Sequence, residues 1–88
     1  MDGLDNFIAI GADMEHQRWV GWQKHLHSLC IKNEDGSLTI PKERVDRWER
    51  QISASYADLP DNEKEFDRIE VRKYIPAILD LIEKKIVQ

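Results

Sequence analysis

Residues 12–31 of the chain read ADMEHQRWVGWQKHLHSLCI, and this stretch decides the fold class. Its large apolar side chains recur at i, i+3, i+7 and i+10, at Trp19, Trp22, Leu26 and Leu29. A recurrence at this spacing puts all of them on one face of an α-helix. The stretch therefore predicts a helix over residues 12–31 with one apolar stripe.

The segment before this stretch predicts a shorter helix. Within residues 2–10, Leu4, Phe7 and Ile8 lie at i, i+3 and i+4, which is again helical spacing. Gly11 interrupts the pattern. Because a glycine inside a helix costs roughly 1 kcal/mol relative to alanine, Gly11 is a candidate break between the two helices.

Residues 31–40 differ in character from the helical segments on either side. Residues 33–37, NEDGS, form a run of turn-favouring residues, and LTI at residues 38–40 is short and partly β-branched. This order predicts a two-strand hairpin around Asp35 and Gly36. A hairpin of this size is marginal alone, so we expect it to pack on the helices.

The C-terminal half predicts further helices joined by a connector at residues 56–60. Pro41 suits the first turn of a helix over residues 41–53. A longer apolar pattern then runs to about residue 86, with Pro76 in its middle. The ring of a proline clashes with the carbonyl four residues earlier, so we expect a kink or break there.

These elements predict a mostly α-helical fold, which is one small domain over residues 1–88 with three to four helices and a short β-hairpin near 31–40. We expect the core where three apolar surfaces, centred on Trp19, Trp48 and Ile78, fold against one another. A chain of 88 residues has a thin core, so a surface groove is easier to build than a deep cavity.

Composition narrows the classes of function. A formal net charge of −4 disfavours long-range attraction to nucleic acid or anionic lipid. Cys30 is the single cysteine, which excludes a disulfide framework. Residues 1–11 show no secretion signal, and no apolar run approaches the roughly 18 residues that span a bilayer. We therefore expect a cytoplasmic protein with neither membrane nor nucleic acid as its partner.

Two motifs are similar to a known family, namely EHQRW at residues 15–19 and YADLPDNEKEFDR at residues 56–68. The second resembles the Tyr-x-(Asp/Glu)-Leu-x-x-x-Glu-Lys-x-x-Asp-Arg signature of the ryanodine receptor (RyR) repeat domain, and the first resembles that domain's His-x-x-Trp helix. The likeness covers roughly residues 12–27 and 56–80, while the segment between departs from the family's Gly/Pro-rich loop. It implies a helical, non-enzymatic recognition module of the kind found in small bacterial and bacteriophage proteins. We accordingly expect a phage or prophage origin, which would place the protein in the host cytoplasm.

We expect recognition in a groove between the 12–31 helix and the 56–86 helices. The ligand would be a protein partner or a small, anionic, nucleotide-like molecule. The candidate binding residues are His16, Trp19, Tyr56, Arg68 and Arg47.

The charged turn within the second motif has three interpretations. One is a solvated helix face with weak ion pairs, and another is a direct contact with the ligand. The third, which we favour, is a structural clamp in which this turn pins another segment, such as the connector at Tyr56 or the side chain of His16. The residues of the clamp are Glu63, Lys64 and Asp67, next to Arg68.

No enzyme signature appears in the chain. His27 and Cys30 lie at i, i+3, but two ligands fall short of the four that a structural zinc site needs. No triad, paired carboxylates or phosphate-binding loop is present, so we expect no catalytic residue, metal or cofactor. The alternative function is a structural homodimer built on the C-terminal apolar helix, through Ile75, Ile78, Ile82 and Ile86.

Overall fold

The computed structural model describes residues 3–87, with side chains through residue 84. Within that range the chain is mostly α-helical with one short antiparallel hairpin, which confirms the predicted fold class. The elements are α1 (Gly3–Leu29), β1 (Ile31–Lys32), β2 (Leu38–Thr39), α2 (Lys42–Ser53), the 3-10 helix η1 (Tyr56–Asp58), α3 (Asp61–Arg72) and α4 (Ile75–Val87). None of these helices combines the length and apolarity needed to cross a membrane.

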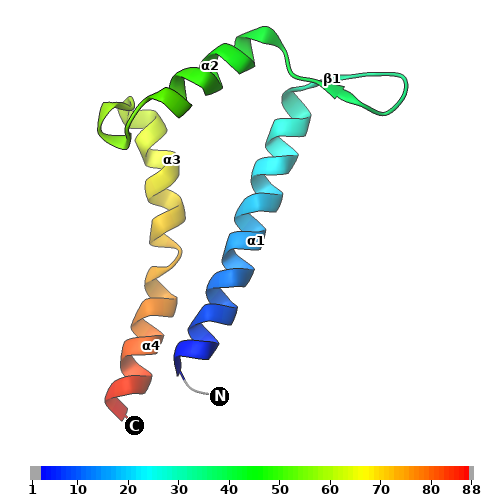
Figure 1. Cartoon of the computed structure of the whole chain (residues 1–88). Helices are drawn as coiled ribbons and strands as arrows, with labels where there is room; N and C mark the ends of the chain where they lie inside the picture. Colours follow the sequence, from blue (N-terminus) through cyan, green and yellow to red (C-terminus); the bar gives the residue numbers. More distant parts are fainter. Residues whose placement is uncertain (1–2, 88) are drawn as a thin grey trace.

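The helices form an open arch (Figure 1). Helix α1 is one arm, α3 and α4 in line are the other, and α2 spans the two arms at the end from which the hairpin projects. At the opposite end α4 packs against the first half of α1. The chain measures 56 × 35 × 16 Å, and its thin dimension is close to the diameter of one helix with its side chains. The arch is therefore a single layer of helices.

A single layer leaves no interior, and the exposure of the side chains shows this. No apolar side chain is buried among the described residues, and the one buried residue is a charged one, Glu63. The radius of gyration is 17.9 Å, against about 12 Å for a compact domain of this length. The core predicted around Trp19, Trp48 and Ile78 is thus wrong. Trp19 is 58% exposed and Ile78 42% exposed, because no second layer covers them.

Helix α1 runs without interruption through Gly11, so the candidate break does not occur. A Cβ at this position would lie 3.9 Å from Cε1 of Tyr74, which is ordinary van der Waals contact. Gly11 therefore lies where α1 meets the start of the α4 arm. The propensity cost of one glycine is small beside the hydrogen bonds of a continuous helix.

Pro76 does break the C-terminal helix, as predicted. Helix α3 ends at Arg72, the residue whose carbonyl the proline ring would meet, and α4 begins at Ile75 with Pro76 in its first turn. The amide of Ile78 donates to the carbonyl of Tyr74 over 2.9 Å, which starts the new helix. The break separates an α3 that lines a cleft from an α4 that packs on α1.

The hairpin is held by its turn rather than by packing, because all of residues 31–40 are exposed. Ile31 pairs with Thr39, and Lys32 with Leu38. The side-chain amide of Asn33 donates to Thr39 Oγ1 over 2.9 Å. Gly36 takes a φ of +88°, a conformation that other residues adopt only at a cost.

Two glycine substitutions should act in opposite directions. Gly11→Ala adds a methyl in ordinary contact and removes a helix-interior glycine, so it should raise the free energy of unfolding by about 0.5–1 kcal/mol. Gly36→Ala forces alanine into the left-handed region and should lower it by about 1 kcal/mol. Urea unfolding at one fixed protein concentration measures both changes. A loss of stability in Gly11→Ala would show that the contact with Tyr74 cannot accept a methyl group.

Candidate functional site

A cleft of about 1060 Å³ opens between α1, α2 and α3. It lies at the end of the arch that α2 spans, away from the packed α1–α4 end. Its lining includes Arg18 and Trp22 on α1, Arg44, Arg47 and Trp48 on α2, and Phe66 on α3. The cleft thus has aromatic walls and a basic edge on α2, while α3 adds the acidic side chains of Glu63, Asp67 and Glu70.

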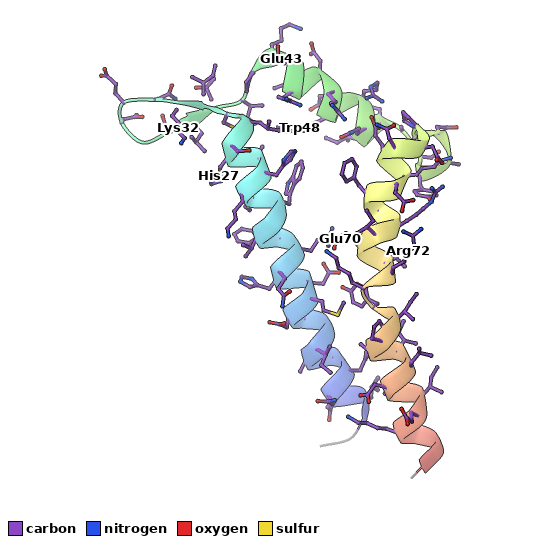
Figure 2. All side chains as sticks on the ribbon, turned by 180° about the vertical axis from the view of Figure 1, so that it is seen from behind. His27, Lys32, Glu43, Trp48, Glu70 and Arg72 are labelled. Atoms are coloured by element: carbon purple, nitrogen blue, oxygen red, sulfur yellow. The ribbon has the colours of Figure 1, made fainter. Side chains whose placement is uncertain are left out.

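Aromatic side chains link α1 to α2 at the top of the cleft. The rings of Trp22 and Trp48 meet edge to face, with centroids 5.6 Å apart and planes 68° apart, a favoured aromatic geometry. Figure 2 shows Trp48 on the side of α2 that faces α1. Trp22 stays 45% exposed, and Phe66 on the opposite wall is 68% exposed. Apolar surface is therefore available inside the cleft.

A polar cluster joins α1 to the α3–α4 break at the lower end of the cleft. The hydroxyl of Tyr74 donates to Glu15, and Arg18 pairs with the same carboxylate over 2.7 Å. The hydrogen bond from Tyr74, and after it Arg18, holds the pKa of Glu15 below its ordinary value. The same hydrogen bond raises the pKa of Tyr74. Figure 2 shows Glu70 on the side of α3 that faces α1, where it pairs with Lys73 over 3.1 Å.

An ionic joint holds α2 to α3. The guanidinium of Arg50 donates to Glu63 Oε2 over 3.0 Å, and Arg47 approaches the same oxygen at 4.0 Å. The side chain of Glu63 is only 7% exposed. The hydrogen bond from Arg50 lowers the pKa of Glu63, and the Gln51 side chain adds to this effect. Glu63 therefore acts between two helices, which is the kind of role expected of the clamp.

The rest of the predicted clamp lies mainly outside the cleft. Arg68 Nε donates to the hydroxyl of Tyr56 over 3.0 Å, and Lys64 Nζ sits 5.6 Å from the centre of the Tyr56 ring. These contacts hold the connector to the first turns of α3. Asp67 lines the cleft instead and makes no hydrogen bond or ion pair with another described residue.

The structure does not bring the five candidate binding residues together. His16 stacks on Trp19 with ring centroids 6.0 Å apart on α1, and neither residue lines the cleft. Tyr56 and Arg68 bond to each other away from it, so Arg47 is the one candidate that lines the cleft.

Sequence reasoning missed Trp22, Phe66 and Arg44 as lining residues. The apolar residues Trp22 and Phe66 were interpreted as core residues, because an apolar stripe carries no information on whether a second layer of helices covers it. One signal was present in the sequence. Arg44, Arg47 and Trp48 lie at i, i+3 and i+4, so they share one face of α2.

The remaining candidate chemistry has a structural explanation. No group of three or more His, Cys, Asp or Glu side chains within the described residues could hold a metal ion. The thiol of Cys30 donates to the carbonyl of Leu26 over 3.2 Å.

No protein-family model, curated protein or solved structure matches this chain. The resemblance to the ryanodine receptor repeat therefore stays a prediction.

The pKa of Glu63 makes the joint between α2 and α3 sensitive to acid. Because the folded-state pKa lies below the ordinary value of 4.5, the joint stabilises the fold above that pH. The contribution is lost as the pH falls through the folded-state pKa. Glu63→Gln should therefore lower the Tm at neutral pH, and this difference should shrink as the pH falls below 4.5.

Circular dichroism melts between neutral pH and about pH 3 test this expectation. Glu49→Gln is the matched control, because Glu49 is exposed on α2, lies outside its first turn and does not line the cleft. The control should melt as the unaltered chain does at each pH. A Tm difference for Glu63→Gln that is the same at every pH would contradict the ionic joint.

Proposed function

We propose that the chain is a non-enzymatic recognition module whose cleft binds an amphipathic helical segment of a protein partner. The observation that carries this proposal is the exposed aromatic surface of Trp22 and Phe66 on facing walls of one cleft, beside two arginines of α2. Tryptophan and arginine are the residues most enriched among the energetically dominant contacts of protein interfaces.

The shape of the cleft favours a polypeptide. Its volume of about 1060 Å³ lies at the upper limit of the roughly 300–1,000 Å³ of small-molecule sites, so its shape decides. Two helices, α1 and α3, form its long walls, and apolar side chains point into it from both. An amphipathic helix binds in such a groove through apolar residues at i, i+3, i+4 and i+7. Such a bound helix would cover the exposed walls of the cleft and so supply the second layer that the arch lacks.

The charges at the edge favour an acidic flank on that segment. Arg44 makes no ion pair with any described residue, and the ion pair of Arg47 with Glu63 is long, at 4.0 Å. Both arginines lie beside Trp48 on one face of α2. Arginine binds carboxylates through paired hydrogen bonds, so glutamates or aspartates next to the apolar residues of the partner would complete the contact.

The proposed cellular compartment rests on the cysteine content of the chain. A single free cysteine, Cys30, suits a reducing cytoplasm, and we place the module there. A phage or prophage origin would make this the host cytoplasm and the partner a host protein.

A pair of designed peptides tests the proposal. Each is about 15 residues long with Leu and Trp at i, i+3, i+4 and i+7, and the flanks are glutamate in one and lysine in the other. The glutamate peptide should bind at least about tenfold more tightly, and Arg44→Glu should abolish this preference. Fluorescence anisotropy of the labelled peptides measures binding.

Lys32→Glu makes the same change of charge on the hairpin and is the matched control. It should keep the preference for the glutamate peptide, because Lys32 does not line the cleft. Equal binding of both peptides, or equal effects of Arg44→Glu and Lys32→Glu, would contradict the proposal. Saturable binding of ATP that Arg44→Glu abolishes, with neither peptide bound, would assign the cleft to an anionic nucleotide-like ligand instead.

A further inference from the structure

The end of the arch opposite the cleft carries a second exposed apolar surface. Its members on α1 are Leu4 and Ile8, at 56% and 58% exposure, and its members on α4 are Ile75, Ile78 and Ile82, at 49%, 42% and 49%. We call these five residues the α1–α4 face. The side chain of Ile86, the fourth residue of the stripe expected from the sequence, lies outside the described side chains.

The contacts between the helices place these five residues on one side of the layer. Helix α1 meets α4 through Gly3 and Gly11, where a Cβ would lie 3.3 Å from Leu81 and 3.9 Å from Tyr74. From the direction midway between Gly3 and Gly11, Leu4 and Ile8 are reached by rotating about 60–100° in the sense of the helix.

The isoleucines of α4 are reached by a rotation of about 50–110° in the same sense from the direction midway between Tyr74 and Leu81. In an antiparallel pair, equal rotations in the same sense lead to the same side. The α1–α4 face is therefore continuous across both helices.

Three charged residues of this end lie on the other side. Asp80 and Lys84 pair over 3.2 Å, and their helical positions place them opposite the isoleucines. Asp13 accepts a hydrogen bond of 2.6 Å from Gln17 on the corresponding side of α1. The α1–α4 layer thus has one apolar and one polar side, as a helix pair has when its apolar side is covered.

We infer that the α1–α4 face binds a second copy of this chain, so that two α1–α4 pairs stack into a four-helix bundle. An apolar, uncharged patch is self-complementary, which a two-fold symmetric interface requires. Stacking turns one layer into the two that a stable domain needs. Each chain carries a net charge of −4, so contact through the five uncharged side chains of the α1–α4 face limits repulsion between the copies.

The area of exposed surface agrees with a dimer. The chain exposes 7126 Å², whereas a compact monomer of its mass, 10.4 kDa, exposes about 5,400 Å². The excess is about 1,700 Å² per chain, shared between the α1–α4 face and the cleft. Covering about half of this excess in each chain would bury about 1,700 Å² in total, which is the size of a standard protein interface.

The dimer is independent of the proposed function. Its residues belong to the α1–α4 end of the arch, whereas the peptide cleft lies between α1, α2 and α3 at the other end. Arg44→Glu should leave the mass of the assembly unchanged, so failure of either proposal can be recognised while the other stands.

Sedimentation equilibrium of the full chain under reducing conditions tests the dimer. At about 100 µM the mass should be twice 10.4 kDa, and Ile78→Lys should raise the dissociation constant at least about 100-fold. Ile52→Lys is the matched control, since Ile52 is 75% exposed on α2 and outside the α1–α4 face, and it should keep the dimer. A helical monomer at this concentration, or a dimer lost equally in both variants, would overturn the inference.

Two further measurements keep the test decisive if Ile78→Lys fails to fold. The milder Ile78→Ala should weaken the dimer while circular dichroism still reports helix. The Tm of the unaltered chain should rise by several degrees between about 1 µM and about 100 µM, because association stabilises the folded state by mass action. A Tm that is independent of concentration over this range, together with a monomer mass, would contradict a dimer.

Discussion

A layer one helix thick gives every helix two sides in contact with water, and this constraint governs the rest of the molecule. Hydrophobic burial is the main driving force of folding, and it requires that apolar surfaces be covered. Here α1 and α4 cover only the strip along which they touch. The chain satisfies its backbone hydrogen bonds within helices, but it leaves most of its apolar side chains for something else to cover. Both the cleft and the α1–α4 face follow from this one feature.

Polar contacts join the helices at the places where a hydrophobic core would otherwise hold them together. Glu63 ties α2 to α3 through Arg50, Tyr74 ties the α3–α4 break to Glu15 on α1, and Arg68 holds the connector through Tyr56. Exposed ion pairs contribute little to stability, because water competes for both partners and the side chains lose freedom. The exposed joints at Tyr74 and Arg68 therefore set the directions of the helices more than they stabilise them, whereas the joint at the buried Glu63 also stabilises the fold. Polar and charged contacts thus set the shape of the arch, and binding partners would cover its exposed apolar surfaces.

The sequence was informative where a local residue dictates backbone geometry. Pro76 predicted the break before α4, Pro41 the start of α2, and Asp35 and Gly36 the turn of the hairpin, since each acts within its own few residues. Gly11 gave a wrong prediction of a break, because the free-energy cost of one glycine inside a helix is small beside that of breaking a long helix. Periodicity also identified the apolar stripes of Trp22 and Ile78, but it cannot say what lies opposite a stripe. For that reason the expected core was wrong, and the cleft contains Arg47 but not His16, Trp19, Tyr56 or Arg68.

The packing of the first turn of α1 against the far end of α4 has a consequence for biosynthesis. Gly3 meets Leu81, so α1 leaves the ribosome several seconds before its partner exists, at synthesis rates of about 5–20 residues per second. Isolated helices are marginal in water, and α1 carries exposed tryptophans throughout this interval. The arch therefore closes only after nearly the whole chain has been translated. Until then the side of α1 that meets α4 stays in contact with water.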